Sequence, residues 1–216
     1  MREFKFEYLI SYGLLFLAIL YIVTGSKKTK NKTYLMFCFY LTVIGIIDAT
    51  AGTLAFLKKY NLFLSHFYFV AEFITLSFFF RKLLMLKQRK FVNALIGVVS
   101  FVLLILFIIS GLDYYELKPL NPFQIIICAL PILIFTVMHL YNSMINEIRF
   151  VFVSVGVLFY KTLSVVIFMV LNFANTKEFV GSFSSMLWDL NQICLLIYMG
   201  LIFTEWFKNY RVKKSS

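Results

Sequence analysis

Four ionisable residues stand inside long apolar stretches of this sequence: Asp48, Glu72, Lys161 and Asp189. Near the centre of a membrane-spanning helix, such a side chain costs about 2.5–3.5 kcal/mol on insertion scales, so it needs a partner, water or a ligand. One interpretation is that Lys161 pairs with Glu72 or Asp189 and only fixes how the helices pack. Three acids and one base leave excess negative charge, however, which favours a binding pocket or a proton-responsive site.

These four residues lie at similar depths in their segments. A helix rises about 1.5 Å per residue, which puts Lys161 about 16 Å from the start of its apolar segment. The same rise puts Asp48 and Glu72 about 14–15 Å, and Asp189 about 9 Å, from the edges of their segments on one side of the membrane. We therefore expect four helices to bring their charges to one layer, in one half of the membrane or at its midplane.

Helical periodicity groups further polar side chains with these charges. Glu72 follows Tyr68 by four residues and Gln192 follows Asp189 by three, and both spacings bring side chains onto one helix face. Trp188 lies at a similar depth and could wall a pocket. The predicted ligand-binding pocket consists of Asp48, Tyr68, Glu72, Lys161, Trp188, Asp189 and Gln192, with His66 and Asn191 as accessory residues.

Seven apolar segments must position these side chains. The chain is 62% hydrophobic and 14% charged, whereas soluble domains are about 45–50% apolar and about 25% charged. We expect an all-α polytopic membrane protein, a single seven-helix transmembrane bundle over residues 1–216 whose first helix is not cleaved, with Pro131 bending the fifth helix and a loop around residues 113–122. The expected helices are residues 8–24, 34–57, 62–86, 91–110, 123–141, 150–173 and 183–207.

The distribution of Lys and Arg predicts the orientation. The net charge of +11 comes from short basic clusters between apolar segments, a pattern that excludes nucleic acid as a partner. The larger share of the 21 Lys and Arg residues lies near 27–32, 81–90 and 208–214, on one side of the membrane. Under the positive-inside rule, the N-terminus lies outside and the C-terminus lies in the cytoplasm of a bacterial cytoplasmic (inner) membrane, with the charged layer in the outer half.

Motifs of enzymes and metal sites are missing from the sequence. There is no phosphate-binding glycine loop, nucleophile elbow or zinc-protease helix. His66 and His139 lack acidic ligands at coordinating spacing, so we expect no metal. Both histidines are expected at membrane interfaces, His66 facing lipid headgroups. The cysteines lie on separate apolar segments, where we expect packing and no disulfide: Cys38, Cys128 and Cys194.

The third apolar segment carries a resemblance. Its residues 62–80 contain His66, Tyr68 and Glu72 ahead of an aromatic run, and this pattern resembles small uncharacterised seven-helix membrane proteins of Bacteroidota-type bacteria. The similarity extends loosely to residues 156–160 and 188–192. The resemblance implies a membrane topology and a sensory role, and it marks these three side chains as site residues.

A second, fainter likeness is to lysoplasmalogenase-like membrane hydrolases. Residues 45–48, which end in Asp48, and residues 65–68 look similar to the paired-aspartate and histidine–tyrosine helices of that family. This likeness implies an intramembrane lipid hydrolase with Asp48 and Asp189 as catalytic residues.

We expect a receptor-like or sensory membrane protein, and lean against an enzyme. Its partners would be membrane lipids and a cytoplasmic signalling protein that binds the basic loops and tail. The alternatives are the lipid hydrolase with paired aspartates and a small-solute or proton-coupled transporter, which needs a continuous polar path. Only Lys161 itself supports a retinal Schiff base, and we expect no cofactor.

Overall fold

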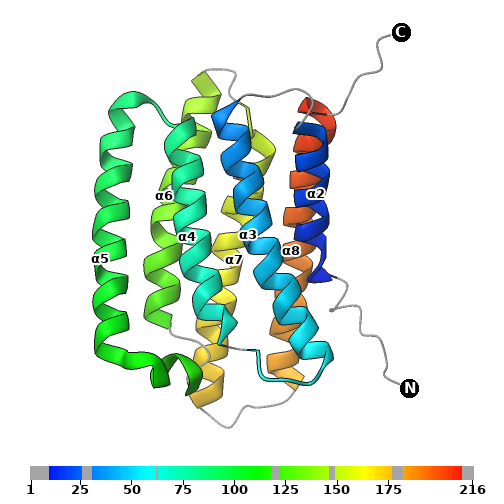
Figure 1. The fold of residues 1–216 in the computed structure, drawn as a ribbon, viewed down its shortest axis with the longest axis vertical. Helices are drawn as coiled ribbons and strands as arrows, with labels where there is room; N and C mark the ends of the chain where they lie inside the picture. The colour runs from blue at the N-terminus through cyan, green and yellow to red at the C-terminus, as the bar shows by residue number, and fades with distance from the viewer. Residues whose placement is uncertain are drawn as a thin grey trace.

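The computed structural model describes residues 10–25, 31–61, 63–117, 122–145, 149–176 and 182–210. Across these residues the chain is all-helical, with seven helices that run alternately in opposite directions (Figure 1). Their bounds are Gly13–Gly25 (α2), Lys32–Phe56 (α3), Leu64–Leu83 (α4), Leu86–Leu117 (α5), Pro122–Ile145 (α6), Val151–Thr176 (α7) and Ser182–Asn209 (α8).

Five of the described helices are long and apolar enough to cross a membrane: α3, α5, α6, α7 and α8. The apolar helix α2 is shorter, at 13 residues, and α4 carries Glu72, Arg81 and Lys82 within its 20 residues. The predicted all-α class is confirmed. Because the five candidate spans match the thickness of a bilayer and expose apolar faces, the chain is an integral membrane protein that contacts lipid.

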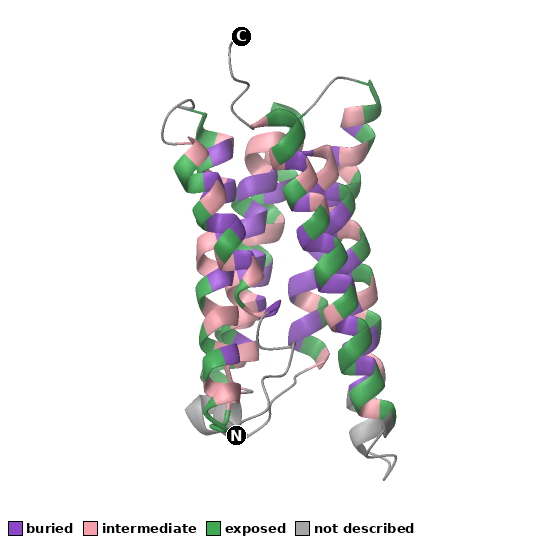
Figure 2. Cartoon of the chain, turned by 90° about the vertical axis from the view of Figure 1, so that its right-hand side faces the viewer, coloured by how far each residue is buried: buried purple, intermediate pink, exposed green. Residues whose placement is uncertain are grey.

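The helices pack into a bundle with α5 at its edge (Figure 1). Helix α7 packs against α6 and α8, α4 packs against α3 and α6, and α2 packs against α3 and α8. Only 11% of the apolar span of α5 is buried, compared with 50% for α6 and for α7. Buried residues face the middle of the bundle (Figure 2), so α5 is the most lipid-exposed of the candidate spans.

A glycine allows α2 and α3 to approach closely. A Cβ atom on Gly45 would lie 2.7 Å from the backbone nitrogen of Leu15 and 2.8 Å from its Cα. Small residues at helix interfaces let backbones come together and gain van der Waals contact, which drives helix association in lipid. Gly45 is therefore required by the packing of α2 on α3.

Aromatic side chains fill the half of the bundle that includes the start of α7. The ring of Phe37 lies 5.1 Å from those of Tyr21 and Phe79, and Phe79 lies 5.2 Å from Phe150. Such pairs add about 0.5–1.5 kcal/mol beyond the area that they bury. We call this set the aromatic core; all its members are at most 1% exposed: Tyr21, Tyr34, Phe37, Phe79, Phe80 and Phe150.

Glu205 of α8 caps the first turn of α7, a role that the sequence analysis missed. Its Oε1 accepts a hydrogen bond from the backbone N–H of Phe150 (2.8 Å), and its Oε2 accepts one from Phe152 (3.1 Å). The side chain of Asn209 donates to Oε1 at 2.7 Å. A carboxylate is favourable at a helix N-terminus, where unpaired N–H groups and the helix dipole carry positive charge. Glu205 therefore joins α7 to α8 at this end of the bundle.

Some predicted helix limits were wrong. The loop expected from residue 113 begins later, because α5 continues to Leu117 and the first proline after it is Pro119. Residues 118–121 lie outside the described part. Helix α4 ends at Leu83, since Leu84 is extended (φ −76°, ψ 154°), and α5 begins already at Leu86. Pro131 lies inside α6, which continues through it.

Candidate functional site

The intramembrane lysine and glutamate form an ion pair. The ammonium group of Lys161 on α7 donates a hydrogen bond to Oε2 of Glu72 on α4. Lys161 is 3% exposed and Glu72 is 1% exposed. The Lys161 ammonium also lies 5.6 Å from the ring centroids of Tyr68 and Phe69 and 5.7 Å from that of Tyr160. Within about 6 Å of a ring face, a cation is attracted by the π electrons.

This pairing decides between two expectations for Lys161. The sequence left open whether it would pair with Glu72 or Asp189, and the structure pairs it with Glu72. Breaking a buried pair by removing one partner costs about 3–5 kcal/mol, since the other charge is left uncompensated. Lys161 is therefore already paired, and a further acid beside the pair has no ion-pair partner among the described residues.

That further acid is Asp48, which lines a cavity of about 250 Å³. The cavity lies between α3, α4, α7 and α8 and reaches the end of the bundle that holds residues 57–61 and the start of α4. Asp48 is half-buried and accepts no hydrogen bond from the described residues. The lining residues include Asp48, Ala51, Gly52, Ala55, Asn61, Ser65, Tyr68, Phe69, Tyr160, Phe168, Trp188, Asn191, Gln192 and Leu195.

The local sequence of α3 explains why space remains here. Asp48, Ala51, Gly52 and Ala55 follow the spacing i, i+3, i+4, i+7, so they form one continuous face. Three of these four residues are alanine or glycine, whose side chains are too small to fill the centre of the bundle. The lining residues of α8 follow the same spacing: Trp188, Asn191, Gln192 and Leu195.

Two amide side chains on α8 that line the cavity have unpaired oxygens. Neither Oδ1 of Asn191 nor Oε1 of Gln192 has a hydrogen-bond partner among the described residues, and both residues line the cavity. Asn191 is 5% exposed. A buried polar group without a partner costs about 1–3 kcal/mol. Unpaired amides beside an unpaired carboxylate are the arrangement expected where a ligand or water completes the hydrogen bonds.

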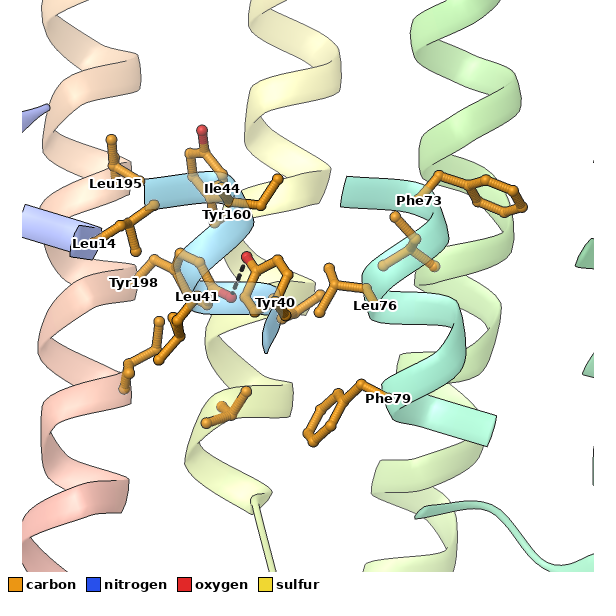
Figure 3. Close-up of a cluster of buried hydrophobic side chains, with 14 of the residues drawn as sticks. Leu14, Tyr40, Leu41, Ile44, Phe73, Leu76, Phe79, Tyr160, Leu195 and Tyr198 are labelled. Carbon is orange, nitrogen blue, oxygen red and sulfur yellow. Dashed lines mark hydrogen bonds between the residues drawn. The ribbon is translucent and has the colours of Figure 1, made fainter. Parts of the chain in front are cut away.

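Aromatic rings enclose the cavity and close its inner end. Phe168 packs against Trp188 at 5.8 Å, and on the other side against a ring of α4. Deeper in the bundle, Tyr160 stacks on Tyr198 with centroids 5.4 Å apart and planes 2° apart. The hydroxyl of Tyr198 bonds to that of Tyr40 at 2.8 Å (Figure 3). This tyrosine floor, Tyr40, Tyr160 and Tyr198, separates the cavity from the aromatic core.

The structure brings some of the predicted pocket residues together and leaves others outside. Glu72 and Lys161 pair with each other beside the cavity. Asp189 is exposed and does not line the cavity, although it neighbours Trp188 in sequence. Asp48 and Asp189 therefore do not share this cavity, as the paired-aspartate hydrolase would require. The predicted residues that do line it are Asp48, Tyr68, Trp188, Asn191 and Gln192.

The prediction that His66 faces lipid headgroups was wrong, and both histidines are buried in the bundle. His66 is 3% exposed rather than facing headgroups, because Gln124 of α6 binds it: His66 Nδ1 lies 2.6 Å from Gln124 Oε1, and Gln124 Nε2 donates to the His66 carbonyl at 3.2 Å. His139 is fully buried, with Nδ1 2.8 Å from the hydroxyl of Ser154 on α7. Both join α6 to a neighbouring helix, and partners so distant in sequence cannot be identified from spacing.

Asn61 is a lining residue that the sequence analysis missed. Its side-chain amide donates to the carbonyl of Ala51 at 3.0 Å, which holds the connection after α3 over the cavity. An asparagine between two apolar segments could have indicated such a contact, because Asn favours turns in which its side chain bonds to the backbone.

The three cysteines are buried and free, as expected for packing residues. Among the described residues, no group of three or more His, Cys, Asp or Glu side chains could hold a metal ion. Comparison of the chain with protein-family models, with curated proteins and with solved structures finds no match.

Proposed function

We propose that this chain is a receptor-like, seven-span protein of the bacterial cytoplasmic membrane that binds a small solute from outside. In this proposal the N-terminus is outside and the C-terminus is in the cytoplasm, as the basic clusters favour. The bound state is passed to a cytoplasmic partner that contacts the basic loops and tail. Lys208 of that tail is described, and Arg211, Lys213 and Lys214 lie outside the described residues.

The observation that carries the proposal is the cavity beside Asp48. It has an unpaired carboxylate, unpaired amides and aromatic walls, the composition typical of small-molecule sites. It reaches the end of the bundle that would face outward in the proposed orientation. A site reached from outside, in a chain with basic loops on the other side, is the layout that a sensory protein needs.

The two alternatives receive less support. A transporter or proton-coupled channel needs a polar path through the whole membrane, whereas the tyrosine floor and the aromatic core fill the described bundle below the cavity. A hydrolase with paired aspartates needs two carboxyl groups around one water. Only Asp48 of that pair lines the cavity.

Helices α7 and α8 offer a route for the signal. Both line the cavity at one end of the bundle, and Glu205 of α8 caps α7 at the other end. A ligand that draws α7 and α8 towards α3 would move their opposite ends as one unit. In the proposed orientation those ends carry Arg149 and Lys208, which face the cytoplasm.

The test combines topology with binding. Cysteine replaces exposed Lys59 or Lys208 in a chain whose native cysteines are changed to alanine, and intact spheroplasts are treated with a membrane-impermeant maleimide. We expect Lys59→Cys to be labelled at once and Lys208→Cys only after permeabilisation. The reverse pattern would overturn the proposed orientation.

For binding, the protein in liposomes is screened for thermal stabilisation by solutes of defined charge, with lipid turnover and ion flux measured in parallel. We expect stabilisation without turnover or flux. Ala51→Leu, which fills the cavity, should remove the stabilisation, whereas Ala94→Leu on exposed α5 should keep it. Lipid hydrolysis that both Asp48→Asn and Asp189→Asn abolish, or flux that Asp48→Asn abolishes, would contradict a receptor.

A further inference from the structure

We propose that the cavity recognises a small organic cation, a protonated amine on a short apolar or aromatic body, with the carboxylate of Asp48 as its counter-ion. This rests on the proposed function, because it names the class of solute that the receptor-like protein binds. Three features of the described residues carry it: the local charge, the unpaired hydrogen-bond acceptors, and the walls and volume of the cavity.

The charge around the cavity favours a cation. Two acids, Asp48 and Glu72, lie around a single base, Lys161, and the base is bound to Glu72. Among the described residues, no Lys or Arg side chain lines the cavity, and Asp48 forms no ion pair. An anionic ligand would add like charge to this carboxylate and is disfavoured. A cationic ligand supplies the missing partner and makes the site neutral.

The unpaired hydrogen-bonding atoms are acceptors. Oδ1 of Asn191 and Oε1 of Gln192 are buried without a donor, on the α8 wall of the cavity that has Asp48 on its α3 wall. An ammonium group has three donors and no acceptor, so it can use a carboxylate and two amide oxygens together. Asn191 is 5% exposed, and an amide at that burial gains most from a ligand that completes its bonds.

The walls and the volume define the rest of the ligand. Rings from three helices line the cavity: Tyr68 and Phe69 from α4, Phe168 from α7 and Trp188 from α8. Aromatic faces attract cations and pack against apolar groups. The volume of about 250 Å³ falls below the range of roughly 300–1,000 Å³ that holds drug-sized ligands. The ligand is therefore a small molecule with one charged end and an apolar body.

The test uses three probes with the same aromatic body and different end groups: phenethylamine (cation), 2-phenylethanol (neutral) and 3-phenylpropionate (anion). The chain has two tryptophans, Trp188 in the cavity wall and Trp206 on the same helix. In a Trp206→Phe background, the fluorescence of Trp188 reports binding directly. The protein is held in nanodiscs of zwitterionic lipid, so that a charged bilayer does not concentrate one probe.

We expect phenethylamine to change the fluorescence of Trp188 saturably, with an affinity at least about tenfold higher than that of either other probe. Asp48→Asn should weaken its binding by about ten- to a hundredfold, the loss typical of one hydrogen-bonded charge. Asp189→Asn makes the same chemical change at an exposed acid outside the cavity, and should leave the affinity unchanged. Gln192→Leu, a second variant in case Asp48→Asn does not fold, should also weaken phenethylamine binding.

The other outcomes separate this inference from the proposed function. If 2-phenylethanol or 3-phenylpropionate binds as tightly as phenethylamine, or if Asp48→Asn binds phenethylamine unchanged, the cation inference is wrong while the cavity remains a binding site. If none of the three probes binds and the solute screen with Ala51→Leu is also negative, the proposed function itself fails.

Discussion

Lys161 of α7 and Glu72 of α4 meet inside the bundle as a buried ion pair, enclosed by the rings of Tyr68, Phe69 and Tyr160. The pair joins two helices whose rings also pack together, as Phe69 does with Phe168. It also leaves Asp48, in the adjoining cavity, without an ion-pair partner among the described residues. One contact therefore has two consequences, one for stability and one for the charge that a ligand meets.

For stability, we predict that Lys161→Met and Glu72→Gln each lower the free energy of unfolding by about 3–5 kcal/mol, because each leaves one buried group unpaired. The double variant should be more stable than either single variant, since neither member of the pair is then left buried without its partner. A double-mutant cycle, measured by titrating detergent-solubilised protein with SDS, gives the coupling. Additive losses would mean that the two groups do not interact in the folded protein.

The contact between α2 and α3 gives a steric prediction. Gly45→Ala would place a Cβ 2.7 Å from backbone atoms of α2, which cannot rotate away as a side chain would. We expect the free energy of unfolding to fall by about 1–3 kcal/mol, the usual cost of overpacking. Gly97→Ala on α5 is the matched control, because its Cβ would meet nothing within 4 Å. Equal effects of the two substitutions would contradict the close packing of α2 on α3.

Hydropathy was sufficient to predict the helices, for a physical reason. In lipid, every backbone N–H and C=O must be bonded within its own segment, so an apolar stretch of the right length has to be helical. The ends were harder to predict. Residues 113–117 contain Asp113 and Glu116 and were expected in a loop, yet α5 continues through them. Charged side chains do not end a helix, whereas a proline does.

The inward face of each helix was only partly predictable. On α8 the sequence offers two overlapping polar faces, one through Asp189 and Gln192 and one through Trp188, Asn191 and Gln192. Periodicity identifies which residues share a face but not which face turns inward. In the structure the second face lines the interior, where Trp188 packs against Phe168 of α7, and Asp189 on the first face is exposed. The presence of a charge was therefore a poor guide to the interior of α8.

The tyrosine floor gives a third prediction. The hydroxyls of Tyr40 and Tyr198 bond at 2.8 Å and join α3 to α8, two helices whose described backbones do not approach closely. Hydrogen bonds between membrane helices are worth about 0.6 kcal/mol on average and up to about 1.7 kcal/mol. Tyr40→Phe and Tyr198→Phe should each cost about this much, and the double variant little more. Full additivity in the SDS titration would rule out the bond as a link between these helices.

The cap on α7 gives the last prediction, and it separates charge from shape. Glu205 is fully buried and accepts hydrogen bonds from the N–H groups of Phe150 and Phe152 and from Asn209. Glu205→Gln keeps the shape but loses the negative charge that the helix N-terminus favours, so we expect a loss of about 1–3 kcal/mol. Glu205→Ala should cost more, since it also leaves buried N–H groups without an acceptor. Asn209→Ala removes only one of the three bonds and should cost least. Unfolding free energies measured in one detergent test this order, and a Glu205→Gln variant as stable as the parent would mean that the carboxylate acts only as a neutral acceptor.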